Sequence, residues 1–153
     1  MISNANGNHI QSIVDLGTDY YASSRFNNYA EYNAQQAFSF IKAAVIDPLR
    51  HIDVLVLDDV VEGFCVAHAG VQAWSSALMC NVSLLYVTPE HRGNGWETVF
   101  VERVEAWAKL HNMDEVLLGD YAMTPERTRL LTERMGYDTV GYIGAKRLDV
   151  ETV

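Results

Sequence analysis

The sequence predicts an α/β (α+β) fold with one mixed central sheet of about six strands and about four helices. Three observations support this prediction. Two apolar runs, 52–57 and 60–70, form a hairpin that precedes a third run, 78–87, which favours an antiparallel N-terminal part of the sheet. A long amphipathic helix, 96–109, links the third run to a short apolar segment, 116–118. Strand, helix and strand in this order form a βαβ unit, which contains a parallel pair with a right-handed connection.

Length and composition indicate one domain that spans residues 1–153. Of the 153 residues, 49% are apolar and 3 are prolines, and no low-complexity tract marks a linker. The start of the chain lacks the basic and apolar regions of a signal peptide, and no apolar run approaches the ~18 residues of a bilayer span. We therefore expect a cytoplasmic protein without membrane association. Cys65 and Cys80 lie in apolar stretches, which predicts buried free thiols rather than a disulfide or a metal pair.

The formal net charge of −9 narrows the classes of partner. No basic stripe is present to neutralise phosphates, so general nucleic-acid binding is not expected. An acidic surface suits a cationic substrate or partner, such as an amine, through electrostatic steering. The same acidity is equally explained by solubility alone.

Two helices are expected before the first strand of the hairpin. Residues 1–9 are polar and predict a loose start of the chain. Apolar residues recur at helical spacing over 10–21. Asn33 is placed to cap a second helix over 34–45, and Pro48 lies just past its end.

Turn and helix-end signals set the remaining boundaries. The acidic pair 58–59 predicts the turn of the hairpin, and Gly63 indicates a bulge or a longer turn in the returning strand. Pro125 begins a helix and Gly136 ends it. The segment 139–148 is expected to be a last strand that closes the sheet.

The loop between the third apolar run and the long helix is the strongest functional signal. Residues 92–95 read Arg-Gly-Asn-Gly, and Gly93 and Gly95 permit positive φ and close backbone approach. Several N–H groups can then converge on one anion at the positive end of the helix, which is the arrangement of a pyrophosphate cradle. A strand-to-helix turn without any ligand is the competing interpretation.

Two motifs resemble those of a known family. The segment 87–95 (V-T-P-E-H-R-G-N-G) resembles the acyl-CoA site of the GNAT superfamily of N-acyltransferases, in which a strand ending V-x-P precedes Q/R-x-x-G-x-G/A and a helix. The segment 131–137 (L-T-E-R-M-G-Y) is similar to the family's closing L-Y-E-K-x-G-F/Y motif. The order of elements resembles the family over about 52–148. The resemblance implies that the parallel pair of strands splays apart.

In that family, the pantetheine arm of an acyl-CoA lies between the splayed strands. The resemblance therefore implies acetyl-CoA as the acyl-donor cosubstrate, with backbone groups of Leu85, Tyr86 and Val87 beside the pantetheine. It also implies that the guanidinium of Arg92 adds charge-assisted bonds to the pyrophosphate. The backbone amides that it assigns to the pyrophosphate belong to Arg92, Gly93, Asn94, Gly95, Trp96 and Glu97.

Three positions depart from the family pattern. Glu97 stands where the loop normally has Gly or Ala, Thr132 where a Tyr often serves as general acid, and Asn81 where many members carry a glutamate base. The carboxylate of Glu97 either repels the phosphates or swings outward into solvent. Repulsion between two like charges ~4 Å apart in water costs about 1 kcal/mol.

The replacements for the missing acid and base are therefore expected elsewhere. Ser83 can relay a water as base, His68 on the neighbouring strand is a second candidate base, and Tyr121 is the best replacement acid. Each has a competing structural interpretation, as a packed histidine or a structural tyrosine. The five histidines are scattered without ligand spacing, so no metal site is expected.

In the family, the two N-terminal helices and their connecting loop form one wall of the acceptor site. By that analogy the candidate specificity residues are Asp19, Tyr20, Tyr21, Arg25 and Tyr29. Trp74, in the loop before the third apolar run, is either a lid over this site or an aromatic packed onto the sheet, and we favour the second.

The resemblance implies an acetyl-CoA-dependent N-acetyltransferase. It would transfer an acetyl group to a primary amine, on a small molecule, a protein lysine or a protein N-terminus, by direct attack in a ternary complex. The alternative is a catalytically degenerate GNAT-like module that acts by protein–protein binding, with or without CoA. The three departures favour the alternative, whereas Arg92, Gly93 and Gly95 favour the enzyme. Many relatives pair through sheet edges or exposed helices, so a homodimer is a further expectation.

Overall fold

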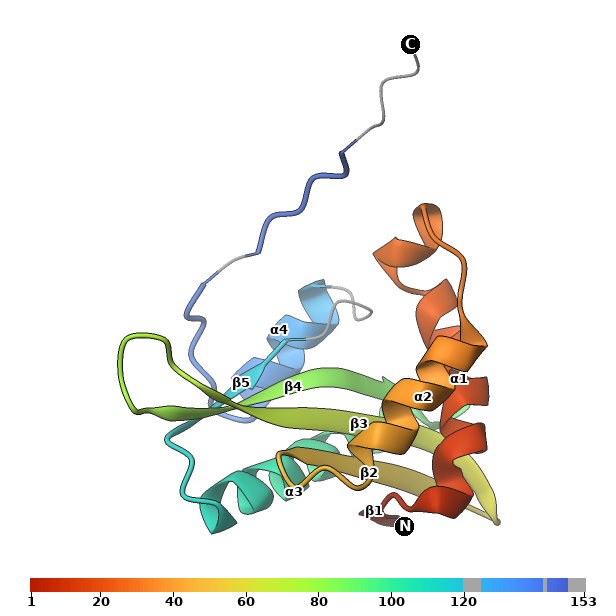
Figure 1. Ribbon diagram of the computed structural model, residues 1–153, viewed down its shortest axis with the longest axis horizontal. Coiled ribbons are helices and arrows are strands. Elements are labelled where there is room, and N and C mark those ends of the chain that lie inside the picture. Colours follow the sequence, from red (N-terminus) through yellow and green to blue (C-terminus); the bar gives the residue numbers. More distant parts are fainter. Residues whose placement is uncertain (120–124, 142, 149–153) are drawn as a thin grey trace.

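The computed structural model describes residues 1–119, 125–141 and 143–148. In this part of the chain, one five-stranded mixed sheet lies between two layers of helices (Figure 1). The strand order is β1-β2-β3-β4-β5, and only the β4–β5 pair is parallel. The strands are β1 (Ile2–Asn4), β2 (Arg50–Leu57), β3 (Val60–Val71), β4 (Leu78–Val87) and β5 (Glu115–Leu118). The α-helices are α1 (Ile10–Ala22), α2 (Ala34–Ala44), α3 (Trp96–Leu110) and α4 (Pro125–Arg134).

Side-chain alternation along the strands separates two cores. On one face, residues such as Leu55, Cys65 and Val82 pack against α3 and against Leu131 of α4. On the other face, residues such as Phe64 pack against α1 and α2. This is the α+β fold with an antiparallel part and a parallel pair that the sequence predicts, with five strands rather than about six. The predicted free thiols are confirmed, because Cys65 and Cys80 are both buried and unbonded to each other.

The local signals for helices and turns are confirmed. Asn33 caps α2 by accepting a hydrogen bond from the Gln36 amide. The 58–59 pair forms the β2–β3 turn with φ values of 49° and 65°, which is the conformation that a tight hairpin needs at both central residues. The expected bulge lies beside Gly63: the register slips so that Glu62 is an extra residue between Val61 and Gly63.

The expectation of a loose N-terminus was wrong. Residues Ile2–Asn4 form β1, which pairs antiparallel with β2. Ile2 is the one buried residue of this strand, and the terminal ammonium donates a 2.8 Å hydrogen bond to the carbonyl oxygen of Val56. A three-residue strand has almost no sequence pattern of its own, so β1 is stabilised by its pairing with β2.

The expected last strand was also wrong. Residues 139–141 and 143–148 are irregular and exposed, and in Figure 1 this segment runs away from the sheet. Gly141 and Gly144 interrupt its apolar alternation, and glycine weakens a strand because it has no side chain to pack. β5, at the edge of the sheet, offers only four residues for pairing.

None of the helices in the described ranges is long and apolar enough to cross a lipid bilayer.

Candidate functional site

The β4–β5 pair is joined over only part of the length of β4. Parallel pairing runs from Met79 with Glu115 to Val82 with Leu118, and β4 then continues to Val87. The change coincides with a bulge at Ser83, where Ala67 pairs with Val82 but the neighbouring Val66 pairs with Leu84. A bulge bends its strand and increases the local twist. Beyond Val82, β4 stays paired with β3, but among the described residues it has no strand partner on its other edge.

The loop after β4 is anchored by its arginine. The short 3-10 helix η3 (Pro89–His91) follows β4, and Arg92 comes next. The Nε atom of Arg92 donates a 2.8 Å hydrogen bond to the carbonyl oxygen of Val87. Its guanidinium carbon lies 5.4 Å from the ring centroid of Tyr86, at cation–π distance. The side chain that was expected to reach a pyrophosphate is therefore folded back onto the end of β4.

Both loop glycines have the predicted left-handed conformation. Gly93 has φ of 81° and Gly95 has φ of 85°, and Gly95 is the N-cap residue of α3. A Cβ added at either position would meet no heavy atom of the described residues within 4 Å, so with respect to these residues the backbone faces open space. Glycine is required by the torsion angles and not by crowding.

The start of α3 presents a group of unbonded backbone donors. The first residue of this helix with a backbone acceptor is Val99, which donates to Gly95, and Gly95 makes no side-chain cap bond. Within the described residues, six successive N–H groups therefore have no protein acceptor: those of Gly93, Asn94, Gly95, Trp96, Glu97 and Thr98. Such a series at the positive end of a helix is an anion-binding arrangement.

The Glu97 side chain does not extend into solvent, which was one of its two predicted arrangements. Its carboxylate lies 3.5 Å from the Nη2 atom of Arg127, on α4, and its side chain is only 16% exposed. The pair lines a small pocket of about 110 Å³ with Leu130, Leu131 and Arg134. The ion pair compensates the negative charge that Glu97 brings to the first turn of α3, and it draws the carboxylate toward α4.

The two candidate bases lie near each other on the sheet. His68 on β3 is the register partner of Asn81 on β4, and both side chains fall on the face that carries α1 and α2. Ser83, two residues further along β4, donates its hydroxyl proton to the carbonyl oxygen of Val66 at 3.2 Å. Its lone pairs therefore remain available to accept a bond from water.

The structure says less about the general acid than about the candidate bases. Tyr121 lies outside the described residues. Thr132 donates its hydroxyl to the carbonyl oxygen of Arg129, one turn earlier in α4, at 2.9 Å. This back-bond within the helix occupies the only proton that Thr132 could deliver.

The residues around the Tyr86 hydroxyl include both acidic and basic groups. Burial and the nearby carboxylates of Asp19 and Glu90 raise the pKa of Tyr86, against the opposing effect of Arg92. Asp19 comes from α1 and Glu90 from η3, so acidic side chains from two separate elements act on the Tyr86 hydroxyl. Tyr20 also packs its ring edge against Tyr86, with centroids 6.2 Å apart.

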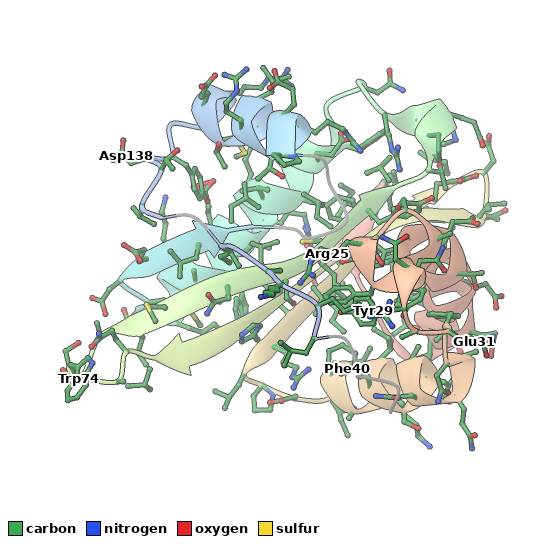
Figure 2. All side chains as sticks on the ribbon, turned by 90° about the horizontal axis from the view of Figure 1, so that it is seen from above. Arg25, Tyr29, Glu31, Phe40, Trp74 and Asp138 are labelled. Atoms are coloured by element: carbon green, nitrogen blue, oxygen red, sulfur yellow. The ribbon has the colours of Figure 1, made fainter. Side chains whose placement is uncertain are left out.

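The rest of the expected acceptor wall is a network of aromatic and loop contacts. The Tyr21 hydroxyl donates to the carbonyl oxygen of Ala30 at 2.9 Å, which fixes the loop after α1. The guanidinium carbon of Arg25 lies 4.5 Å from the Phe26 ring centroid. Tyr29 is 43% exposed and faces Arg147, whose guanidinium carbon is 5.0 Å from its ring. Figure 2 shows Arg25 and Tyr29 together on this side of the molecule.

Trp74 is neither a lid nor a packed aromatic. It is 92% exposed, at the connection between β3 and β4. Figure 2 places it at the far end of the sheet from Tyr29 and Arg25. The prediction that this ring packs onto the sheet was therefore wrong.

Three features were missed by sequence reasoning. The bond from Arg92 to Val87 and the pair of Glu97 with Arg127 depend on side-chain directions that no local pattern encodes. The third is a cluster of Glu62, Glu90 and His91, in which one potential ligand atom from each residue lies within 4.8 Å of the others, although the histidines show no ligand spacing along the sequence. Glu90 and His91 are adjacent in sequence, and that adjacency was the available signal.

Comparison with known proteins supports the fold assignment. No protein-family model matches the sequence, and no curated protein does either. Among solved structures, the ribosomal-protein-alanine N-acetyltransferase of Brucella melitensis biovar Abortus 2308 matches with a TM-score of 0.71 at 15% identity, covering 97% of this chain and 98% of that one. A predicted acetyltransferase from Clostridium acetobutylicum, solved with acetyl-CoA, matches with a TM-score of 0.75 at 14% identity, covering 95% of both chains.

A third neighbour is an aminoglycoside N-acetyltransferase in complex with CoA, with a TM-score of 0.69 at 15% identity, covering 98% of this chain and 95% of that one. The similarity extends over nearly the whole length of each chain. The protein therefore has the fold of the GNAT acetyltransferases.

Proposed function

We propose that this protein is an acetyl-CoA-dependent N-acetyltransferase that acts on a primary amine. The observation that carries the proposal is the series of six N–H groups from Gly93 to Thr98 that have no acceptor among the described residues. They lie next to the half of β4 that extends beyond its pairing with β5. These groups supply what an acyl-CoA needs: donors for a pyrophosphate and an extended backbone for a pantetheine. Two neighbours of the same fold were solved with acetyl-CoA or CoA.

The acyl donor would bind through backbone more than through side chains. The pyrophosphate would lie over Gly93, Asn94 and Gly95, where the described residues leave open space beside both glycines. The pantetheine would lie along Leu85, Tyr86 and Val87, with its thioester near the bulge at Ser83. Arg92 would hold the loop in position and add positive potential, whereas Trp96 and Glu97 would contribute their amides.

Transfer would proceed by direct attack. The neutral amine nitrogen forms a bond to the thioester carbonyl carbon, the carbonyl electrons move to the oxygen, and the oxyanion accepts a hydrogen bond from a backbone N–H of residues 85–87. Collapse breaks the C–S bond, the amine loses a proton and the CoA sulfur gains one. We assign the amine proton to water held by Ser83 or to His68, and the proton for the thiolate to Tyr121.

An amine is the acceptor that the charges favour. Asp19 and Glu90 bring carboxylates to the end of β4 near Tyr86, and the chain carries a formal net charge of −9. A protonated amine is attracted into such a field before it loses its proton. The wall formed by α1, α2 and their loop would select between small amines, lysine side chains and protein N-termini.

The experiment is an acetylation assay with a panel of small primary amines and of peptides bearing a free lysine or N-terminus. Release of the CoA thiol and the mass gain of one acetyl group are measured together. We expect at least one acceptor to be acetylated, and expect Arg92→Ala to reduce the rate while Arg50→Ala, at the start of β2, leaves it unchanged. If wild-type protein binds acetyl-CoA but acetylates no amine, the protein is a binding module and the proposal of catalysis fails.

A further inference from the structure

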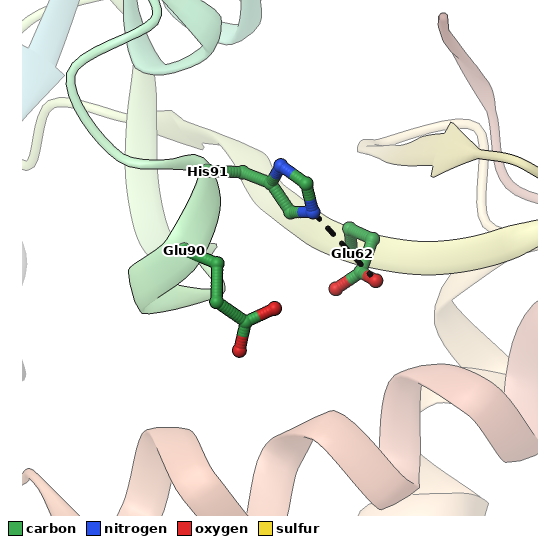
Figure 3. Close-up of side chains that lie close together, drawn as sticks. All are labelled: Glu62, Glu90 and His91. Carbon is green, nitrogen blue, oxygen red and sulfur yellow. Dashed lines mark ion pairs between the residues drawn. The ribbon is translucent and has the colours of Figure 1, made fainter.

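We propose that Glu62, Glu90 and His91 form a binding site for a divalent transition-metal ion of the zinc class. One ligand atom from each residue can be chosen so that all three atoms lie within 4.8 Å of one another. Figure 3 shows Glu62 reaching from β3 toward His91 and Glu90, which come from η3 after β4. The site thus joins two segments that are more than twenty residues apart in sequence.

The separation of the ligand atoms is close to that of a metal site. Zinc binds imidazole nitrogen and carboxylate oxygen at about 2.1 Å, so two ligands of a tetrahedral ion lie about 3.4 Å apart. The Nε2 atom of His91 is 3.8 Å from the Oε1 atom of Glu62. A shift of a few tenths of an ångström in these two side chains is enough, and Glu90, which is exposed, can complete the set by a change of rotamer.

Glu62 is held ready for this role by its surroundings. It is the extra residue of the β3 bulge, and bulges redirect side chains out of the regular alternation. Its Oε2 atom accepts a 2.9 Å hydrogen bond from the hydroxyl of Thr88, which leaves Oε1 toward His91. Thr88 therefore acts as the outer partner that fixes a ligating carboxylate.

The ligand types select the class of ion. One imidazole and two carboxylates suit Zn²⁺ and the neighbouring first-row ions, because imidazole binds these ions well. Mg²⁺ and Ca²⁺ prefer six or more oxygen ligands and would gain little from the histidine. Three protein ligands leave at least one position for water or for an external ligand.

Metal binding would fix the loop that carries the anion-binding amides. Glu90 and His91 immediately precede Arg92, whose side chain bonds to Val87. An ion shared with Glu62 would tie η3 to β3 from one side while Arg92 ties the loop to β4 from the other. Glu90 has a part in both proposals, because its carboxylate also attracts the amine. Ion binding is measured without acetyl transfer, so either proposal can fail while the other stands.

The test uses the full chain without a histidine tag. Zn²⁺ is titrated by calorimetry at neutral pH, and Co²⁺ is followed by its visible absorption. We expect one equivalent of Zn²⁺ to bind and to raise the melting temperature. Loss of an outer-shell partner alone costs about 10–100-fold in metal affinity, so Glu62→Gln and His91→Gln should each weaken binding by at least about tenfold. His111→Gln, an exposed histidine after α3, is the matched control and should change nothing.

Each result decides the proposal. Both test substitutions roughly keep the size of the side chain, and Glu62→Gln keeps an oxygen that can accept the Thr88 bond, so we expect both variants to fold. Circular dichroism checks this. Absence of Zn²⁺ and Co²⁺ binding up to millimolar concentration would overturn the proposal. Binding that is unchanged in both Glu62→Gln and His91→Gln, or that is lost in His111→Gln, would overturn it equally, since the ion would then be held elsewhere.

Discussion

The Nε atom of Arg92 donates its hydrogen bond to the carbonyl oxygen of Val87, the last residue of β4. The bond closes the turn that carries the chain from β4 through η3 into the loop. The bond also gives Arg92 a structural role, while the backbone amides of Gly93 to Thr98 have no acceptor in the part of the chain that the structure describes. In the proposed acyl-CoA site, anion binding at this loop would therefore depend first on backbone conformation and second on the charge of Arg92.

The first prediction concerns the torsion angle of Gly95. Gly95→Ala creates no clash with the described residues, since none of their heavy atoms lies within 4 Å of the added Cβ, but it forces alanine to φ of 85°. We expect a loss of about 1 kcal/mol in the free energy of unfolding, together with weaker acetyl-CoA binding, measured by urea denaturation and calorimetry. Gly7→Ala is the matched control, equally uncrowded and without positive φ. Equal stability of the two variants would contradict the assigned strain.

The second prediction concerns the charge at the first turn of α3. Because Arg127 compensates Glu97, Arg127→Gln should expose the carboxylate and weaken acetyl-CoA binding. Glu97→Gln should leave affinity unchanged or strengthen it. The double variant should recover the affinity that Arg127→Gln loses, since neither charge is then present. The acetyl-CoA affinity of the three variants is measured by calorimetric titration. If the changes in affinity of the two single variants simply add in the double variant, the two residues act separately.

The third prediction concerns the buried carboxylate of Asp53, which is 0% exposed. It accepts hydrogen bonds at 2.8 Å from His51 and from Arg103. Burial alone would raise the pKa of Asp53, but these two partners outweigh it and hold the pKa below its usual value. We expect Asp53→Asn to lower the free energy of unfolding by about 3–5 kcal/mol at neutral pH.

The pH dependence follows from the direction of this shift. Because the folded pKa of Asp53 is depressed, its stabilisation is fully present above the unfolded value of about 3.9 and is lost as pH falls through the folded pKa. The difference in stability between wild type and Asp53→Asn should therefore shrink below about pH 4. Urea denaturation across the acid range measures it. If the stability difference between wild type and Asp53→Asn stays constant down to pH ~2, the ionised carboxylate is not the source of that difference.

The fourth prediction concerns Tyr137, whose buried hydroxyl has no hydrogen-bond partner within the described ranges of the chain. Burial raises the pKa of this hydroxyl, so it stays protonated and unsatisfied at neutral pH. Tyr137→Phe should leave stability unchanged or raise it by up to about 1 kcal/mol. Tyr32→Phe is the control, because the Tyr32 hydroxyl donates to Val14 at 2.7 Å and its loss should cost about 1 kcal/mol. Both variants are measured by thermal or urea unfolding. A larger loss in the free energy of unfolding for Tyr137→Phe than for Tyr32→Phe would contradict this account.

The sequence predicted the elements whose signals are local. Gly93 and Gly95 could be read as left-handed because few other residues adopt that conformation. The 58–59 turn, the Asn33 cap and the βαβ unit likewise depend on short-range rules. β1 was missed because Ile2 is its one buried apolar residue, and its stability comes from pairing with β2, fifty residues away.

The candidate site was predicted less completely for the same physical reason. The backbone cradle follows from loop composition, whereas the partners of Arg92, Glu97 and Glu62 lie on other elements. Such contacts depend on how α4 and β3 pack against the loop, which the local pattern does not contain. The prediction of a strand over 139–148 was wrong because an apolar alternation indicates a strand only when a neighbouring strand is available to pair with it.

The most direct test of the central claim is a calorimetric titration of acetyl-CoA into the purified protein, with free CoA as a second ligand. We predict binding in the micromolar range for both ligands, weakened by about tenfold or more in Arg92→Ala and in Gly93→Ala, and unchanged in Arg50→Ala. No binding up to millimolar acetyl-CoA would contradict the assignment of the Gly93–Thr98 amides to a pyrophosphate. Binding that is unchanged in Arg92→Ala and Gly93→Ala would contradict it as well.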